Sequence, residues 1–160
     1  MRLTSTTGSE FALKIEGYQF PARGIDRYDD NWLQISIEVK SPQGEWNARG
    51  PYLLQWEADR LATWLEGMSK VAPFPGNLAF TEDLSFNEPN LRFELRERTG
   101  ESSTLRLHFE IEFRPPWADK DGESYVDLSL SSHDLLNAAR TMRAELKEFP
   151  ARTAERKLTR

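Results

Sequence analysis

The residues best suited to chemistry in this sequence are carboxylates gathered in two segments. The segments are RGIDRYDDN at 23–31 and RPPWADKDGE at 114–123, and their carboxylates are Asp26, Asp29, Asp30, Asp119, Asp121 and Glu123. Several carboxylate oxygens held by one turn are what a Ca²⁺ ion requires. The second segment matches a calcium loop only in part, because the twelfth position counted from Asp119 is Leu130, where an EF-hand has glutamate. No metal site is therefore predicted, and such loop carboxylates are most often solvated turn formers.

No catalytic constellation accompanies these carboxylates. His108 alternates with charged residues on a predicted strand and His133 lies in the first turn of a predicted helix, so both are interpreted as surface residues. The sequence lacks a nucleophile with an adjacent base, and it lacks the G-x-S-x-G, P-loop, G-x-G-x-x-G and H-E-x-x-H motifs. The absence of cysteine excludes a thiolate zinc site and a cysteine nucleophile. The sequence therefore predicts neither enzymatic activity nor a metal or cofactor.

Trp117 is the remaining candidate in the second segment. Pro115 and Pro116 hold φ near about −65° and restrict the residues before them, so the segment carrying Trp117 is stiff and loses little entropy when it is ordered. Tryptophan is also enriched among the residues that dominate protein interfaces. Alternatively, Trp117 folds back over the sheet edge and the prolines only end the preceding strand. The segment is thus a docking surface, a stiff turn, or partly both.

The net charge of −5 is unevenly distributed along the 160 residues. The last ten residues carry +3, and residues 1–150 carry −8. An acidic body repels phosphate backbones and attracts a basic partner. We therefore expect a basic protein partner and no direct binding of nucleic acid.

The sequence contains no segment suited to a membrane. The amino terminus, MRLTSTTGSE, lacks the apolar stretch of a secretory signal. No apolar run approaches the roughly 20 residues that span a bilayer. The absence of cysteine gives no sign of an oxidising compartment. A cytoplasmic protein is expected.

Apolar and polar residues alternate in several segments, which is typical of half-buried strands. The clear segments lie at 11–15, 31–40, 90–98, 103–113 and 124–130, and shorter strands are predicted around 78–80 and 84–86. In the segment 103–113 the alternation places Ile111 and Phe113 on the inward face. Runs of strands joined by short turns predict an antiparallel sheet.

Two segments have the period of an amphipathic helix. Leu61, Trp64, Leu65 and Met68 follow the i, i+3, i+4, i+7 spacing, which predicts a helix at about 56–70. A second helix is predicted at about 132–148, with Ser131 as N-cap and Asp134 completing a capping box.

The order of strands, helix, strands and helix predicts an α+β fold in which two helices cover a largely antiparallel sheet. It also fits two similar units of strands followed by a helix. The length suits one domain, over residues 1–150, with a basic, disordered tail at 151–160.

The strands at 90–98 and 103–113 are predicted to form a hairpin. Their apolar residues all have odd numbers, and directly opposed residues share a face, so paired numbers should sum to an even value. A three-residue loop, 99–101, satisfies this condition and uses Gly100 for the positive φ such loops need. It places Glu94 opposite Arg106 and Arg92 opposite His108.

Four segments together resemble the WapI family of bacterial immunity proteins: GYQFP at 17–21, YDDNWL at 28–33, NEPNLRFEL at 87–95 and RPPWADKD at 114–121. They occur in the same order over nearly the whole chain up to Pro150. The resemblance implies a cytoplasmic protein that binds and neutralises the toxic C-terminal domain of a cell-wall-associated or polymorphic toxin. In the family's namesake system this domain is a nuclease acting on transfer RNA. The resemblance implies no catalytic residues.

The partner-binding hypothesis combines these observations. Trp117 provides an apolar anchor, and Asp119, Asp121 and Glu123 form a rim that faces a basic toxin domain. The remaining carboxylates, Asp26, Asp29 and Asp30, extend this surface only if the fold brings the two loops together. The alternative is a housekeeping or assembly module that binds another copy of itself or a protein scaffold.

Overall fold

The strands and helices of the chain follow one another in two similar runs. The computed structural model describes residues 1–22, 26–70, 82–100 and 102–152. The strand predicted around 78–80, Glu101 in the predicted hairpin loop and the tail from residue 153 onward lie outside these residues. Neither described helix is long and apolar enough to cross a membrane.

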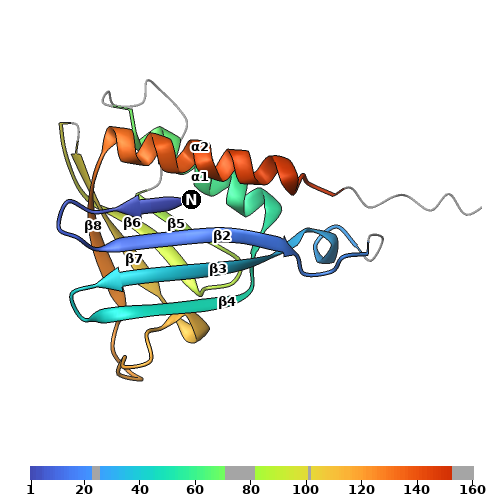
Figure 1. The fold of residues 1–160 in the computed structure, drawn as a ribbon, viewed down its shortest axis with the longest axis horizontal. Helices are drawn as coiled ribbons and strands as arrows, with labels where there is room; N and C mark the ends of the chain where they lie inside the picture. The colour runs from blue at the N-terminus through green and yellow to red at the C-terminus, as the bar shows by residue number, and fades with distance from the viewer. Residues whose placement is uncertain (23–25, 71–81, 101, 153–160) are drawn as a thin grey trace, which may run out of the picture.

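Each run consists of four strands and a closing helix (Figure 1). The first contains β1 (Arg2–Thr4), β2 (Glu10–Tyr18), β3 (Trp32–Ser41), β4 (Gly44–Leu54) and α1 (Gln55–Met68). The second contains β5 (Asp83–Ser85), β6 (Leu91–Thr99), β7 (Ser102–Phe109), β8 (Tyr125–Ser131) and α2 (Ser132–Glu148). Short 3-10 helices, η1 (Asp29–Asn31) and η2 (Ile111–Phe113), precede β3 and follow β7. The predicted α+β class and the two strands-then-helix units are confirmed.

The strands form two antiparallel sheets, each in chain order: sheet A is β1-β2-β3-β4 and sheet B is β5-β6-β7-β8. Their apolar faces meet. The Phe11 ring of β2 lies 5.8 Å from the Phe93 ring and 6.1 Å from the Phe109 ring, both in sheet B. The two helices lie side by side along one side of the sheets (Figure 1). A single apolar core therefore lies between two sheets and a helix pair.

The two sheets are joined at the edge where β1 meets β8. The main-chain N–H of Thr6 donates to the carbonyl of Ser129 at 3.2 Å. The N–H of Ser129 donates to the Ser5 hydroxyl oxygen at 3.0 Å. These hydrogen bonds satisfy main-chain groups that would otherwise be exposed on two sheet edges.

Each helix begins directly after the last strand of its sheet, with a carboxylate in its first turn. The Asp134 carboxylate accepts from the Ser131 N–H at 3.0 Å, and the Ser131 hydroxyl accepts from the Asp134 N–H at 3.1 Å. This confirms the predicted capping box. In α1 the buried Glu57 carboxylate accepts from the Leu54 N–H at 3.0 Å and from the Asn87 N–H at 2.8 Å. Glu57 therefore also ties α1 to the segment that enters β6.

The hairpin register is confirmed near its base and wrong near its loop. Arg92 pairs with His108 and Glu94 with Arg106, as predicted. A bulge between Leu95 and Glu97 then shifts the register, so that Thr99 pairs with Ser102 and the predicted three-residue loop is wrong. Gly100 has the expected positive φ, +56°.

Other sequence predictions also need correction. Strands β1 and β4 were not predicted. Strand β7 ends at Phe109, not at Phe113, and Ile111 lies in η2 with its side chain 56% exposed instead of facing inward. The reason is a turn that follows Glu110: Ile111 has a positive φ, +52°, and the Phe113 N–H donates to the Glu110 carbonyl at 2.9 Å.

His108 is buried and was wrongly interpreted as a surface residue. Its Nε2 lies 2.7 Å from Oε2 of Glu94 on the outer face of sheet B, and the Tyr125 ring lies beside it. The hydrogen bonds from Arg96 and then from His108 lower the pKa of Glu94 to about 2. Long side chains on the neighbouring strands thus cover a residue whose place in the alternation indicated exposure.

The role of Glu57 predicts a large effect of its removal. Glu57→Ala leaves two main-chain donors without their acceptor, so it should lower the free energy of unfolding by about 2–4 kcal/mol in urea denaturation. Asp59→Ala, on the same helix, removes an exposed carboxylate paired with Arg143 and should cost less than about 1 kcal/mol. Equal costs for the two variants would contradict the assigned role.

The lowered pKa of Glu94 predicts a pH-dependent contribution to stability. The unfolded-state value is about 4.3, so the contribution is complete above that pH and is lost as the pH falls towards about 2. Glu94→Gln should therefore flatten the dependence of the unfolding free energy on pH between about 5 and 2, measured by urea titrations. Glu97→Gln removes the same charge from an exposed position on the same strand and should leave the dependence as in the wild type.

Candidate functional site

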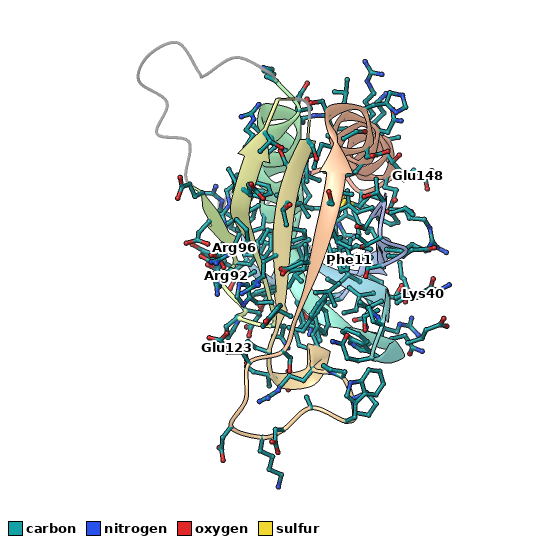
Figure 2. All side chains as sticks on the ribbon, turned by 90° about the vertical axis from the view of Figure 1, so that its left-hand side faces the viewer. Phe11, Lys40, Arg92, Arg96, Glu123 and Glu148 are labelled. Carbon is teal, nitrogen blue, oxygen red and sulfur yellow. The ribbon has the colours of Figure 1, made fainter. Side chains whose placement is uncertain are left out.

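The second acidic segment lies on the loop between β7 and β8, at one end of sheet B. Figure 2 shows this loop below the strands, with Glu123 on the side that leads into β8. The turn between β3 and β4 lies against it, because the Trp117 ring covers Gly44. We call this region, residues 110–124 together with the turn at 41–44, the docking end.

Trp117 is both packed and exposed. Its ring meets the Trp46 ring edge to face, with centroids 5.6 Å apart and an interplanar angle of 85°. A Cβ atom on Gly44 would lie only 2.7 Å from Cη2 of Trp117, so the close packing of the indole requires glycine there. Even so, 46% of Trp117 remains exposed. The two interpretations of the segment, a packed turn and an apolar anchor, are therefore compatible.

The platform beneath Trp117 belongs to the core. Trp46 is buried, and its Nε1–H donates to the Phe113 carbonyl at 2.9 Å. Its ring also meets the Phe109 ring edge to face at 5.1 Å. Trp117 thus rests on a residue of sheet A that is fixed to sheet B.

Arg114 holds the loop in shape, a role that sequence reasoning missed. Its guanidinium donates to the main-chain carbonyls of Lys120 at 2.8 Å and Gly122 at 2.5 Å, and also to that of Asp119. Five fixed donors suit guanidinium to several acceptors at once. Because the acceptors are main-chain atoms, no pattern of side chains in the sequence could have indicated this contact.

Asp119, Asp121 and Glu123 lie on this loop and are exposed. None of the three forms an ion pair within the described part of the chain. Burial raises the pKa of Tyr52, and the charges of Glu112 and Glu88 raise it further. Among the described residues no group of three or more His, Cys, Asp or Glu side chains is arranged to hold a metal ion.

A groove of about 300 Å³ opens beside Trp117. Its walls include Ser41, Trp46, Pro115, Trp117, Glu123 and Tyr125. The exposed rings and the single carboxylate among these residues could contact an apolar or cationic side chain of another protein.

The first acidic segment lies elsewhere. Asp30 is buried, and the Asp26 carboxylate accepts from the N–H groups of Tyr28 at 2.6 Å and Asp29 at 2.9 Å, which makes it a turn former. This segment enters β3 at Trp32, whereas the docking end adjoins the other end of β3. The ten residues of β3 separate this segment from the turn at 41–44, which the Trp117 ring covers, by about 30 Å. The structure therefore does not bring Asp26, Asp29 and Asp30 together with Trp117.

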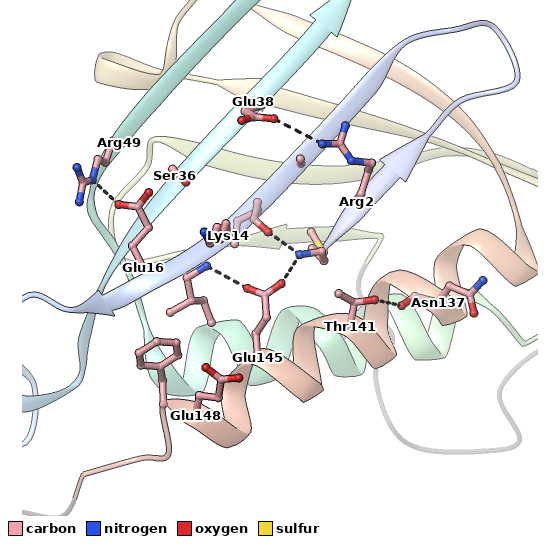
Figure 3. Close-up of a pocket in the computed structure, with 15 residues that line it drawn as sticks. Arg2, Lys14, Glu16, Ser36, Glu38, Arg49, Asn137, Thr141, Glu145 and Glu148 are labelled. Carbon is pink, nitrogen blue, oxygen red and sulfur yellow. Dashed lines mark hydrogen bonds and ion pairs between the residues drawn. The ribbon is translucent and has the colours of Figure 1, made fainter.

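A larger groove, of about 950 Å³, lies between the outer face of sheet A and α2 (Figure 3). Its charges are of both signs and largely engaged with one another. Arg2 pairs with Glu38 at 3.5 Å and Arg49 pairs with Glu16. The Glu145 carboxylate accepts from the Ile15 N–H at 3.0 Å. This groove therefore has fewer unpaired charges of a single sign with which to bind a charged partner than the docking end has.

The comparisons with known proteins agree with the resemblance noted in the sequence. A model of the immunity protein WapI-like family matches residues 2–150. A search among curated proteins found no match. The matched range runs from β1 to the end of α2, so it contains both sheets, both helices and the docking end. The chain therefore belongs to the WapI-like immunity protein family.

Proposed function

We propose that this protein is a bacterial cytoplasmic immunity protein that binds and neutralises the C-terminal toxic domain of a polymorphic or cell-wall-associated toxin. It acts by binding, without catalysis, metal or cofactor. Membership of the family supports an immunity function. The docking end, with Trp117 at its centre, is the surface through which it binds.

The observation that carries the surface assignment is the combination of exposure and rigidity at Trp117. A large ring that is 46% exposed is held by the Trp46 platform beneath it and by the prolines before it. Arg114 fixes the remainder of the loop. A surface that is already ordered loses little conformational entropy when a partner binds, so more of the contact energy appears as affinity.

The charge of this surface favours a basic partner. Asp119, Asp121 and Glu123 are exposed beside Trp117. Residues 110–124 contain five carboxylates and two cationic side chains, Arg114 and Lys120, a formal charge of −3. Nuclease domains that grip phosphate backbones carry Lys and Arg around their clefts. An acidic inhibitor gains association rate and specificity against such a domain.

An immunity gene should lie immediately downstream of a large toxin gene, so the function is tested by expressing the C-terminal domain that this neighbour encodes, with and without the protein. Wild-type protein should restore growth and copurify with the domain. Growth arrest in the presence of abundant folded protein, with no copurification, would contradict the proposal and favour a housekeeping or assembly module.

Trp117→Ala should weaken binding to this toxin domain by about 2 kcal/mol or more, roughly 30-fold, in calorimetry. It should lower the unfolding free energy by only about 1–2 kcal/mol, because half of the ring is already exposed. Trp46→Ala removes the buried ring on which Trp117 rests and should lower the unfolding free energy by about 3–5 kcal/mol.

The matched control for Trp117→Ala is Tyr28→Ala. Tyr28 is also an exposed aromatic residue but lies at the far end of β3, so its removal should leave binding unchanged. Equal loss of affinity in both variants, or none in either, would place the binding surface elsewhere.

Neutralising Asp119 and Asp121 together, each to Asn, should mainly slow association. We expect a several-fold lower rate constant and a weaker dependence of that rate on salt in stopped-flow measurements, because rim charges act on the encounter of the two proteins. Glu97→Gln with Glu148→Gln removes the same number of exposed carboxylates from β6 and α2, outside the docking end, and serves as control. An equal effect of the two pairs would indicate a response to net charge alone.

A further inference from the structure

Ile111 adopts a backbone conformation that side chains rarely occupy. Its φ is +52°, in the left-handed region, and it is β-branched. The other described residues with positive φ are Gly8, Gly44 and Gly100. At Gly100, where φ is +56°, the chain meets almost the same requirement with glycine. A β-branched residue at φ +52° is a conformational cost that glycine would avoid.

The fold needs the turn at Ile111, but it does not need the isoleucine side chain. The turn ends β7 and returns the chain so that Phe113 is fully buried, with its carbonyl accepting from Trp46 Nε1–H at 2.9 Å. The Phe113 N–H donates to the Glu110 carbonyl at 2.9 Å. All of these contacts involve main-chain atoms or other residues. Glycine at position 111 would make the same turn.

The Ile111 side chain adds little to the fold. It is 56% exposed, and it belongs neither to the buried core nor to the partly buried residues packed against it. The other large exposed apolar residues each rest against a neighbouring side chain: Tyr28 against Trp56, Trp117 against Trp46, and Tyr125 against Arg106. Ile111 therefore has an unfavourable backbone conformation, and its side chain buries little apolar surface to offset it. Such positions occur where function requires the side chain.

The surroundings of Ile111 indicate the kind of contact that it could make. It lies on the docking end, six residues before Trp117 in the same β7–β8 connection. The neighbouring Glu112 is exposed and the Glu110 side chain is partly exposed. An apolar side chain between carboxylates complements an apolar recess bordered by Lys or Arg.

We propose that Ile111 is a second apolar anchor of the docking end, inserting into a recess on the basic surface of the toxin domain. This proposal rests on the proposed function, and it adds a residue that the alternation in the sequence placed in the core. An isoleucine occupies this backbone conformation because its side chain binds the partner.

The experiment compares Ile111→Gly with Ile111→Leu, using the C-terminal domain of the toxin encoded immediately upstream as the probe. Both the melting temperature of the free protein and the Kd for the toxin domain are measured. Ile111→Gly should melt at or above the wild-type temperature, because the conformational cost is removed, while its Kd rises at least about tenfold. Ile111→Leu keeps an apolar side chain of the same size and should bind within about threefold of the wild type.

The outcomes separate the possible roles. Weaker binding of Ile111→Gly at unchanged or higher melting temperature supports the anchor. A melting temperature lowered by more than about 4 °C would show a structural role, and a Kd within threefold of the wild type would show no role in binding; either overturns the proposal. Failure of the wild-type protein to bind the toxin domain would instead overturn the proposed function itself.

Discussion

The hydrogen bond from the Trp46 indole to the Phe113 carbonyl is the contact on which the docking end depends. Trp46 comes from the β3–β4 hairpin of sheet A, and Phe113 from the segment that leaves sheet B. A buried indole N–H without an acceptor would be costly, so this bond fixes both the ring and the turn at η2. The same ring packs edge to face against Trp117. Trp46 therefore belongs both to the core and to the support of the candidate binding surface, so the surface is held in place by the core.

The two units of the fold join their last strand to the helix in the same way. In each, the last strand runs into the helix without an intervening residue, from Leu54 to Gln55 and from Ser131 to Ser132. A carboxylate three residues after the N-cap then accepts from the N-cap N–H: Glu57 in α1 and Asp134 in α2. The helix N-terminus favours negative charge, which explains a carboxylate in both places. Only the second junction has the hydroxyl N-cap that makes the motif visible in a sequence, so the two junctions look unrelated until the structure is compared.

Periodicity predicted the helices and most strands because their apolar faces are continuous. It failed where the alternation of apolar and polar residues was interrupted. In β4 the positions alternating with Trp46 include Ala48 and Gly50, which carry little apolar surface, and Pro51 follows them. The register argument from odd and even numbers held up to Leu95 and failed beyond it, because a bulge changes the parity of every later pair. Ile111 fits the alternation of β7, but it lies in the turn that ends the strand, with a positive φ and with the Phe113 N–H donating to the Glu110 carbonyl; the apolar alternation does not report backbone dihedrals.

Only the part of the candidate site that is contiguous in the sequence could be predicted. The prolines and Trp117 stand together in the sequence, whereas the platform that supports the ring comes from residues about seventy positions earlier. Acidity alone also did not identify the surface, because many carboxylates of the sheet faces are already paired, as Asp127 is with Arg106 through two hydrogen bonds of 2.8 Å. A partner that paired with Asp127 would have to compete with Arg106, so its gain would be offset by the pair it broke. Asp119, Asp121 and Glu123 form no such pair within the described part of the chain, and a partner's cation can bind them without that loss. Three exposed carboxylates of the docking end are therefore available to a basic partner, whereas a carboxylate such as Asp127 is not.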